Sequence, residues 1–184
     1  MGRKGTKEKI LQASLKLFSE KGIRETTIKD IAREVRVTEG AIYRHFKSKE
    51  EIVLGLFKLY SEEFYKRLIS VAEDGIPYRD SFSKVVKAFL SFCFENPSAF
   101  RYLNLFHYLR AENIRQFEPL PKDAVLQFIE RGISQGFIKA RREYALAVFV
   151  GTLERVFLLV EAGLLEKEEL LAEEISQIIW KALS

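Results

Sequence analysis

The sequence is poor in residues that cross-link, break or anchor a chain. Its 184 residues include one cysteine, Cys93, which excludes an intramolecular disulfide framework and fits a reducing compartment. Four prolines and ten glycines leave room for long helices. The longest uncharged apolar run, at 144–153, is far shorter than the roughly 20 residues of a membrane span. Residues 1–10 also lack the apolar segment of a signal peptide. We therefore expect a soluble cytoplasmic protein.

Motifs for catalysis or metal binding are equally scarce. The chain has two histidines and contains no glycine-rich phosphate loop, no HExxH and no CxxC. His45 and Cys93 lie in different regions, and the acidic run at 166–169 is typical of a solvated helix end. We expect no enzyme activity, no cofactor and no metal.

Basic charge is concentrated near the N-terminus. Residues 1–50 contain 13 Lys and Arg against 7 Asp and Glu, whereas the rest of the chain contains 17 against 19. Only two of the 15 phenylalanines, Phe18 and Phe46, lie in residues 1–50. Such an asymmetry is expected of a polyanion-binding module joined to a second region. A lysine-rich surface is also typical of an ordinary solvated face, so charge alone does not decide between the two.

Helical periodicity runs through the whole sequence. Thr27 with Asp30, and Ser48 with Glu51, have the spacing of capping boxes, and Gly22 stands where a helix C-cap is expected. No segment alternates with period two over the length of a strand. The sequence predicts an all-α protein of about nine helices, at residues 6–21, 27–35, 39–45, 49–74, 78–95, 97–116, 119–135, 141–164 and 166–183.

Residues 37–52, VTEGAIYRHFKSKEEI, place many polar side chains on a very short apolar face. Ile42 and Phe46 are four residues apart and form the inner side of the third predicted helix. Two short helices joined by a tight turn, the second with its polar residues outward, form a helix-turn-helix. The N-terminus of that second helix, capped by Thr38, can offer N–H groups to a phosphate. Spacing alone favours DNA binding over a small solvated bundle.

Residues 7–55 closely resemble the DNA-binding domain of TetR-family transcriptional regulators. The resemblance lies in TTIKDIAREVRVTEGAIYRHFKSKEEI, preceded by ILQASLKLFSEKGIRETT. A weaker likeness to the family's effector domain lies in ERGISQGFI and in the helix that follows. The resemblance implies an N-terminal DNA-binding domain at 4–64, with its helix-turn-helix at about 27–46. A long fourth helix would link it to a C-terminal effector-binding and dimerisation domain at 65–184.

The resemblance also assigns contacts to individual residues. Those expected to contact phosphate are Thr27, Lys29, Thr38, Tyr43, His45 and Lys49, and those expected to read base edges are Glu39, Gly40, Ala41 and Arg44. Thr27 and Lys29 could also contact bases, and Arg44 could reach the DNA backbone instead. Glu39 could instead favour the helix N-terminus electrostatically, and a histidine such as His45 is often a core residue. Arg36 stands where the family usually has glycine; it either adopts a strained turn or a different one, and it could add a phosphate contact.

Residues 82–128 are rich in aromatic side chains. Phe92 and Phe94 point to different sides of one helix, which must therefore be enclosed by neighbours or line a cavity. Core packing is the simpler explanation. By resemblance we expect a pocket for a small hydrophobic effector here, with His107 as its polar anchor or else as a surface residue. The candidate lining residues are Phe89, Phe92, Cys93, Phe100, Leu103, Phe106, His107, Phe128, Phe149 and Phe157.

The last two predicted helices carry more apolar residues than one face can hold. We expect a two-fold partner to cover the surplus in a four-helix seam, the alternative being a hairpin that serves its own domain only. Gly151, unfavourable within a helix by about 1 kcal/mol relative to Ala, fits the close approach of another helix. The candidate interface residues are Phe149, Val150, Gly151, Leu153, Phe157, Val160, Leu164, Leu171, Ile175, Ile178 and Ile179.

These features together lead to one functional hypothesis. The chain is expected to be a homodimeric repressor that binds a near-palindromic double-stranded DNA operator and leaves it when a small hydrophobic effector binds. An effector-independent architectural DNA-binding protein and a carrier of apolar ligands are the alternatives.

Overall fold

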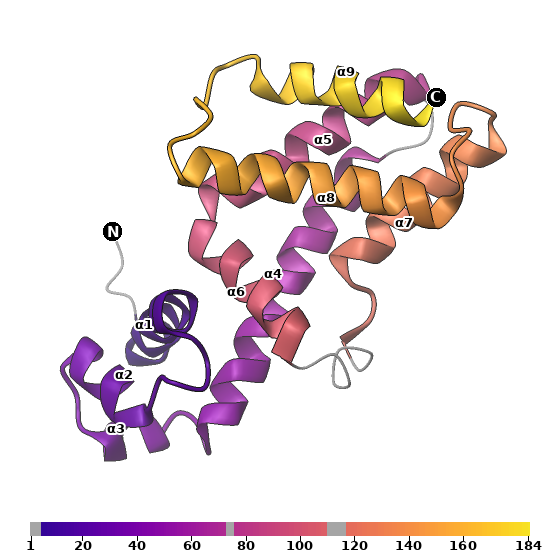
Figure 1. The fold of residues 1–184 in the computed structure, drawn as a ribbon. Coiled ribbons are helices and arrows are strands. Elements are labelled where there is room, and N and C mark those ends of the chain that lie inside the picture. The colour runs from indigo at the N-terminus through magenta and orange to yellow at the C-terminus, as the bar shows by residue number, and fades with distance from the viewer. Residues whose placement is uncertain (1–4, 73–75, 110–116) are drawn as a thin grey trace. The chain divides into compact units, whose positions relative to one another are not determined.

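The computed structural model of the chain describes residues 5–72, 76–109 and 117–184, without the side chains of 107–109. Over these ranges the chain forms nine α-helices and no strand (Figure 1), which confirms the all-α prediction. The helices are α1 (Thr6–Lys21), α2 (Ile28–Val35), α3 (Glu39–Tyr43), α4 (Lys49–Val71), α5 (Tyr78–Glu95), α6 (Pro97–Leu109), α7 (Pro121–Ser134), α8 (Arg142–Glu161) and α9 (Leu171–Leu183).

The helices form two compact units. The N-terminal unit contains the chain up to residue 61 together with 96–118, and the C-terminal unit contains 62–95 together with 119–184. Helix α4 is therefore shared, because its first part belongs to one unit and its last part to the other. The domain limits expected from the sequence, 4–64 and 65–184, remain a prediction.

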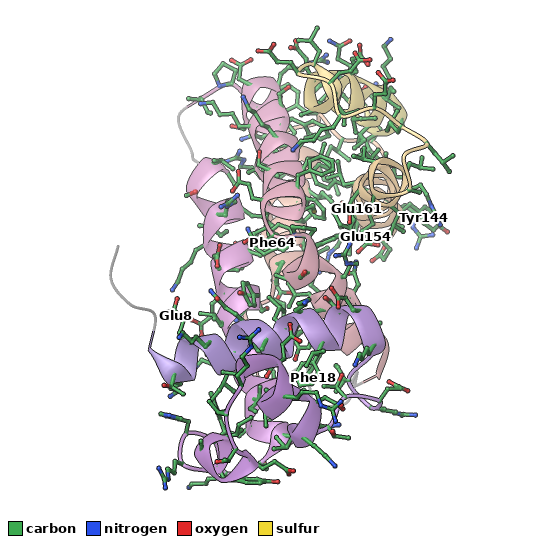
Figure 2. All side chains as sticks on the ribbon, turned by 90° about the vertical axis from the view of Figure 1, so that its left-hand side faces the viewer. Glu8, Phe18, Phe64, Tyr144, Glu154 and Glu161 are labelled. Atoms are coloured by element: carbon green, nitrogen blue, oxygen red, sulfur yellow. The ribbon has the colours of Figure 1, made fainter. Side chains whose placement is uncertain are left out.

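The core of the N-terminal unit joins α1, α2, α4 and α6. Phe18 points from α1 into this unit (Figure 2) and is fully buried. Its ring lies 6.0 Å from that of Tyr102 on α6, and the ring of Phe57 on α4 stacks on that of Phe106 at 4.0 Å. Burying rings of this size supplies much of the stability of so small a unit.

Local caps set the helix starts in this unit. Thr27 and Asp30 form the predicted capping box, since each side chain accepts a hydrogen bond from the other residue's backbone N–H, at 3.1 and 2.9 Å. The second predicted box forms only in part. The hydroxyl of Ser48 accepts from the N–H of Glu51 at 3.2 Å, but the carboxylate of Glu51 reaches one residue further back, to the N–H of Lys47 at 2.5 Å.

The C-terminal unit packs α5 against α8 and α9, which run in opposite directions (Figure 1), and packs α7 against α8. Phe64 on α4 stacks on Phe92 of α5, with ring centroids 4.1 Å apart. Tyr78 at the start of α5 stacks on Phe128 of α7 at 4.7 Å. A Cβ atom at Gly132 would collide with the side chain of Tyr78, so the aromatic ring requires glycine at that position of α7.

Some helix ends differ from the prediction. Helix α3 ends at Tyr43 rather than at residue 45, because the N–H of His45 bonds to Ile42 in a tighter turn. Helix α7 begins at Pro121, which suits the first helical position because it lacks an N–H. The end predicted for the sixth helix, at 116, lies outside the described residues. In the described part of the chain, no helix has the length and apolar character needed to cross a membrane.

Candidate nucleic-acid interface

The turn between α2 and α3 depends on Arg36. This residue has φ 61° and ψ 47°, in the left-handed region. Its N–H bonds to the carbonyl of Arg33 at 3.2 Å, and the N–H of Val37 bonds to that of Ala32 at 2.9 Å, which closes the C-terminus of α2. The sequence left open whether Arg36 adopts a strained conformation or a different turn, and the structure shows the strained, left-handed one. For a non-glycine residue it costs about 1–2 kcal/mol.

Two apolar side chains hold α3 from behind. Ile42 is fully buried and Phe46 is 5% exposed, which confirms that they form the inner face. The ammonium of Lys7 on α1 lies 5.5 Å from the centre of the Phe46 ring. The residues between the two anchors point away from the core: Tyr43 is 52% exposed, and Arg44 and His45 are exposed as well. The second helix of the motif thus presents a polar outer face.

The N-terminus of α3 is capped and open. The Thr38 hydroxyl accepts a hydrogen bond from the N–H of Ala41 at 3.2 Å. The next residues, Glu39 and Gly40, are exposed. A Cβ atom at Gly40 would have the Thr38 hydroxyl oxygen, at 3.9 Å, as its nearest neighbour, so packing within the protein does not require glycine there. The first turn of α3 can therefore be approached closely from outside.

Helix α2, in the same N-terminal unit, is also capped at its N-terminus, by Thr27. The Thr27 hydroxyl donates to the Asp30 carboxylate at 2.6 Å while accepting from the Asp30 N–H. The hydrogen bonds from the Thr27 side chain and backbone lower the pKa of the Asp30 carboxyl. The donor of Thr27 is thus already used within the protein, whereas the neighbouring Lys29 is exposed.

Lys49 has a role that sequence reasoning missed. Its ammonium donates to the carbonyls of Ile23 and Thr26, both at 2.8 Å, and to that of Arg24 at 3.4 Å. The acceptors lie between α1 and α2, more than 20 residues earlier in the chain. No local pattern could have revealed this arrangement, because it depends on how α4 packs against that loop.

An ion pair joins the surfaces of α1 and α2. Lys16 and Glu34 are 2.8 Å apart, and their side chains are 53% and 40% exposed. The hydrogen bond with Glu34 raises the pKa of Lys16, and the same bond lowers the pKa of Glu34. Because both groups are solvated, the pair contributes little to stability.

The predicted DNA-contact residues all lie in the N-terminal unit, and none is buried. Ala41 and Lys49 are half-buried and the others are exposed. The exposed members of the set are Thr27, Lys29, Arg36, Thr38, Glu39, Gly40, Tyr43, Arg44 and His45.

The residues predicted to line an effector pocket are divided between the units. Phe100, Leu103 and Phe106 belong to the N-terminal unit, and the side chain of His107 lies outside the described residues. The remaining members are buried in the C-terminal unit, namely Phe89, Phe92, Cys93, Phe128, Phe149 and Phe157.

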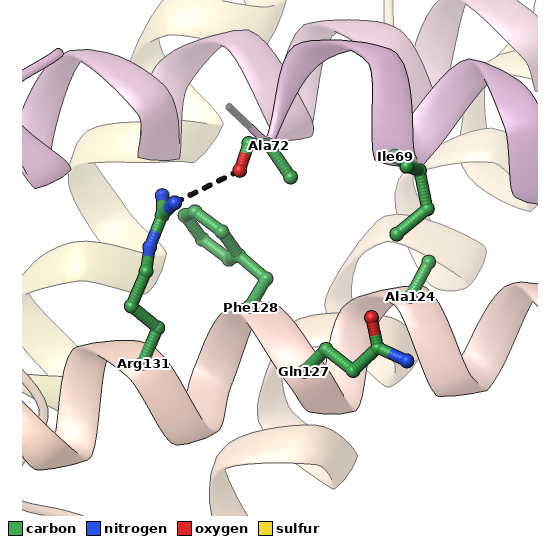
Figure 3. Close-up of a pocket in the computed structure, with 6 residues that line it drawn as sticks. All are labelled: Ile69, Ala72, Ala124, Gln127, Phe128 and Arg131. Atoms are coloured by element: carbon green, nitrogen blue, oxygen red, sulfur yellow. Dashed lines mark hydrogen bonds between the residues drawn. The ribbon is translucent and has the colours of Figure 1, made fainter. Parts of the chain in front are cut away.

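A groove in the C-terminal unit lies between the end of α4 and α7 (Figure 3). Its volume is about 210 Å³, and of the predicted residues Phe128 lines it. The Arg131 guanidinium donates to the carbonyl of Ala72 at 2.9 Å and thus bridges the two helices at one end of the groove. Its other lining residues are Ile69, Ala124 and Gln127.

The predicted dimer residues also differ in exposure. Those buried within the protomer are Phe149, Leu153, Phe157, Leu171 and Ile179, and those half-buried are Val150, Val160 and Ile175. Gly151, Leu164 and Ile178 are exposed. The sequence analysis overlooked a second stripe on α8, made of Tyr144, Val148 and Leu158, which are 61%, 36% and 46% exposed. Its helical spacing was visible in the sequence, but the more apolar opposite face masked it.

The thiol and the acidic groups of the described ranges form no metal site. Within them no three His, Cys, Asp or Glu side chains lie close enough to hold a metal ion. Cys93 is fully buried; burial, and secondarily the charge of Glu154, raises the pKa of its thiol.

Proteins of similar sequence include a helix-turn-helix regulator and a nucleoid occlusion factor. The transcriptional regulator YuxN of Bacillus subtilis (HTH-type) is 34% identical over 79 residues, which is 42% of this chain and 27% of YuxN. The nucleoid occlusion factor SlmA of Vibrio campbellii is 32% identical over 126 residues, which is 68% of this chain and 61% of SlmA. The chain spans about a quarter to three fifths of the length of the curated relatives it matches.

The family itself follows from matches to both parts of the chain. A TetR family transcription regulator from Marinobacter aquaeolei has the same fold, with a TM-score of 0.84 at 18% identity, covering 97% of this chain and 95% of that one. Residues 10–56 match the bacterial regulatory proteins of the tetR family, and residues 57–184 match the tetracyclin repressor-like C-terminal domain. The chain therefore belongs to the TetR family of bacterial regulatory proteins, with an N-terminal helix-turn-helix domain.

Proposed function

We propose that the protein acts in the cytoplasm as a homodimeric repressor, which binds a near-palindromic operator and is released by a small hydrophobic effector. The observation that carries the proposal is the arrangement of α3. Ile42 and Phe46 are buried, while Tyr43, Arg44 and His45 are exposed between them. A helix held in this way can enter a major groove without losing its packing.

The contacts of this helix divide by chemistry. The capped N-terminus at Thr38 carries the positive end of the helix dipole and can take a phosphate. Tyr43 and His45 can donate to phosphates, and so can Lys29 and Arg36. Thr27 could do so only by releasing its hydrogen bond to Asp30. In this proposal the residues that contact base edges are Glu39, Gly40, Ala41 and Arg44. An arginine can donate two hydrogen bonds to guanine, and a carboxylate can accept one from the amine of cytosine.

Gly40 supports close approach to the bases. Glycine in a helix is less stable than alanine by about 1 kcal/mol, and the protein itself leaves room for a Cβ atom at this position. The protein's own packing does not require glycine at position 40, and a partner that comes near the backbone would account for it. In this proposal that partner is DNA, which would approach the exposed first turn of α3.

The exposed stripe on α8 supports a dimer. Tyr144, Val148, Gly151 and Leu158 share one face of the helix, and Ile178 is exposed on α9. Among the described residues, no heavy atom outside the local helix backbone lies within 4 Å of a Cβ built at Gly151, so another helix has room to cross there. A second copy of α8 and α9 would complete a four-helix seam. Each dimer would then present two α3 helices to half-sites about one helical turn, or a multiple, apart.

Effector response is proposed through α4. The groove of about 210 Å³ is smaller than most drug-sized sites of roughly 300–1,000 Å³. A ligand must therefore widen it, by moving α4 and α7 apart. Helix α4 is continuous, and its first part belongs to the N-terminal unit, which carries the helix-turn-helix. A shift at Ile69 and Ala72 can therefore change how much of the protein is in the conformation that binds DNA.

The decisive experiment is selection of bound fragments from a pool of random duplexes, using the full chain. A repressor should enrich an inverted repeat, and apolar compounds can then be screened for release of the enriched duplex. The matched control is Ile42→Asp, which should lose DNA binding because it places a charge behind α3. Failure to enrich any duplex over repeated rounds would rule out the proposal.

A second candidate follows from the similarity to SlmA, whose name describes a nucleoid occlusion factor. A protein that organises DNA without an effector would use the same helix-turn-helix. The release screen separates the two, because such a protein would enrich a motif and stay bound in the presence of every compound.

A further inference from the structure

The loop between α1 and α2 is fastened by one cation. Lys49, the first residue of α4, directs its ammonium toward the carbonyls of Ile23, Arg24 and Thr26, at 2.8, 3.4 and 2.8 Å. A lysine ammonium carries three N–H donors. The three carbonyls therefore match its full donor capacity.

The rest of this loop is fixed from the inside. Thr26 is fully buried, and its hydroxyl lies 2.8 Å from the carbonyl of Gly22 and 3.3 Å from that of Leu17. Ile23 is 2% exposed. Gly22 has a φ of 98°, which suits glycine. Without Lys49, the carbonyls of Ile23 and Thr26 would lose this donor. Burying such acceptors without a partner is unfavourable.

We propose that Lys49 is a positioning residue for DNA binding and does not contact phosphate. The inference rests on the proposed function, since it assigns a role within the same interface. Thr26, one of its acceptors, directly precedes Thr27, which caps α2. By holding this point, the ammonium sets the direction in which the N-terminus of α2 faces.

Reaching a phosphate would oblige the ammonium to leave these acceptors. Lys49 is half-buried, unlike the neighbouring Lys47, which is exposed. Freed carbonyls at Ile23 and Thr26 would lose their charged donor in a partly desolvated place. Contact with the loop is therefore favoured over contact with DNA.

Arginine provides a discriminating substitution. Its guanidinium keeps the positive charge but is planar and longer, whereas a lysine ammonium is a compact point on which three carbonyls can converge. Lys49→Arg should consequently preserve a phosphate contact, if one exists, and disrupt the loop contact. Lys49→Met removes both, and Lys47→Met removes an exposed charge two residues away as the matched control.

The test measures affinity for the selected duplex across a range of salt concentrations. We expect Lys49→Arg and Lys49→Met both to bind on the order of tenfold more weakly, as for one lost charged hydrogen bond. Their salt dependence should equal that of the wild type, and Lys47→Met should keep the wild-type affinity. The inference is overturned if Lys49→Arg binds like the wild type, or if the salt slope of Lys49→Met falls by about one, which marks a lost phosphate contact.

A measurement without DNA separates this inference from the proposed function. In the wild-type chain, NMR of the lysine ammonium groups should show Lys49 protons that exchange with water more slowly than those of exposed Lys47. Equal exchange rates would refute the loop contact even if DNA binding is normal. Thermal melts exclude a folding defect as the cause of weak binding, and the NMR result still decides the matter if a variant does not fold. A wild-type chain that binds no duplex would instead overturn the proposed function, and with it the positioning role.

Discussion

The hydroxyl of Tyr102 donates a hydrogen bond to the backbone carbonyl of Val53 at 2.6 Å. Tyr102 lies on α6 and is fully buried, and Val53 lies on α4. The ring of Tyr102 also faces that of Phe18 on α1. Tyr102, from the middle of the sequence, thus contacts both α1 and α4 of the N-terminal unit. These contacts explain why residues 96–118 belong to that unit.

Replacing this tyrosine by phenylalanine tests the contribution of that hydrogen bond. Tyr102→Phe keeps the ring and removes the hydroxyl, so the free energy of unfolding should fall by about 1 kcal/mol. Urea titration followed by circular dichroism measures the change. Tyr43→Phe, at a side chain that is 52% exposed, is the control and should leave stability in the absence of DNA unaltered. Equal stability of both variants would mean that the buried hydroxyl contributes nothing net.

Gly132 and Gly55 make a matched pair of helical glycines. A methyl group at Gly132 would collide with Tyr78, whereas one at Gly55 would meet no atom within 4 Å. Gly132→Ala should therefore destabilise the protein by about 1–3 kcal/mol through overpacking. Gly55→Ala should stabilise it by about 0.5–1 kcal/mol through helix propensity. Thermal melts of both variants check the opposite signs, and a stabilised Gly132→Ala would contradict the packing described around Tyr78.

Cys93 should report on unfolding. Burial raises the pKa of its thiol, so the reactive thiolate is scarce in the folded chain. Since the folded pKa exceeds the unfolded value of about 8.5, this group favours the folded state fully below that pH and progressively less above it. A disulfide exchange reagent at pH 8 should label Cys93 only slowly, and rapidly in denaturant. Fast labelling of the native protein would contradict the buried position.

The sequence alone was sufficient where structure is local. The cap at Thr27, the C-cap at Gly22 and the anchors Ile42 and Phe46 each depend on residues within about four positions of one another, so periodicity and capping rules predict them. Lys49 shows where this reasoning fails. Its acceptors are 23 to 26 residues away, and only the packing of α4 brings them together.

The C-terminal half illustrates the same limit. Apolar residues of α8 were visible in the sequence, but which of its faces is buried depends on the placement of α5 and α9. Phe149 and Phe157 face inward and are used by their own protomer, while Tyr144 and Leu158 remain exposed. The groove between α4 and α7 is also a product of tertiary packing, since its walls come from residues more than 50 positions apart, such as Ile69 and Gln127.

Leu158 is the position best suited to test the dimer. It is 46% exposed at the C-terminal end of the α8 stripe, so Leu158→Glu should leave the protomer folded and place two like charges in the proposed seam. Light scattering should then show a monomer, in contrast to the dimer that we expect for the wild type. Leu59→Glu, at a leucine that is 49% exposed on α4, is the control and should stay dimeric. A dimeric Leu158→Glu would place the association surface elsewhere.

Arg44 and Tyr43 should separate sequence reading from phosphate positioning. Both are exposed on the outer side of α3. Tyr43→Phe removes the proposed phosphate donor and should weaken binding to all duplexes by a similar factor. Arg44→Ala should cost about 1–3 kcal/mol on the preferred duplex and relax preference at one base pair, because the proposed bidentate contact to guanine would be lost. Repeating the duplex selection with each variant measures both effects. If Arg44→Ala weakens all sequences equally, Arg44 contacts the backbone, and base reading falls to Glu39, Gly40 and Ala41.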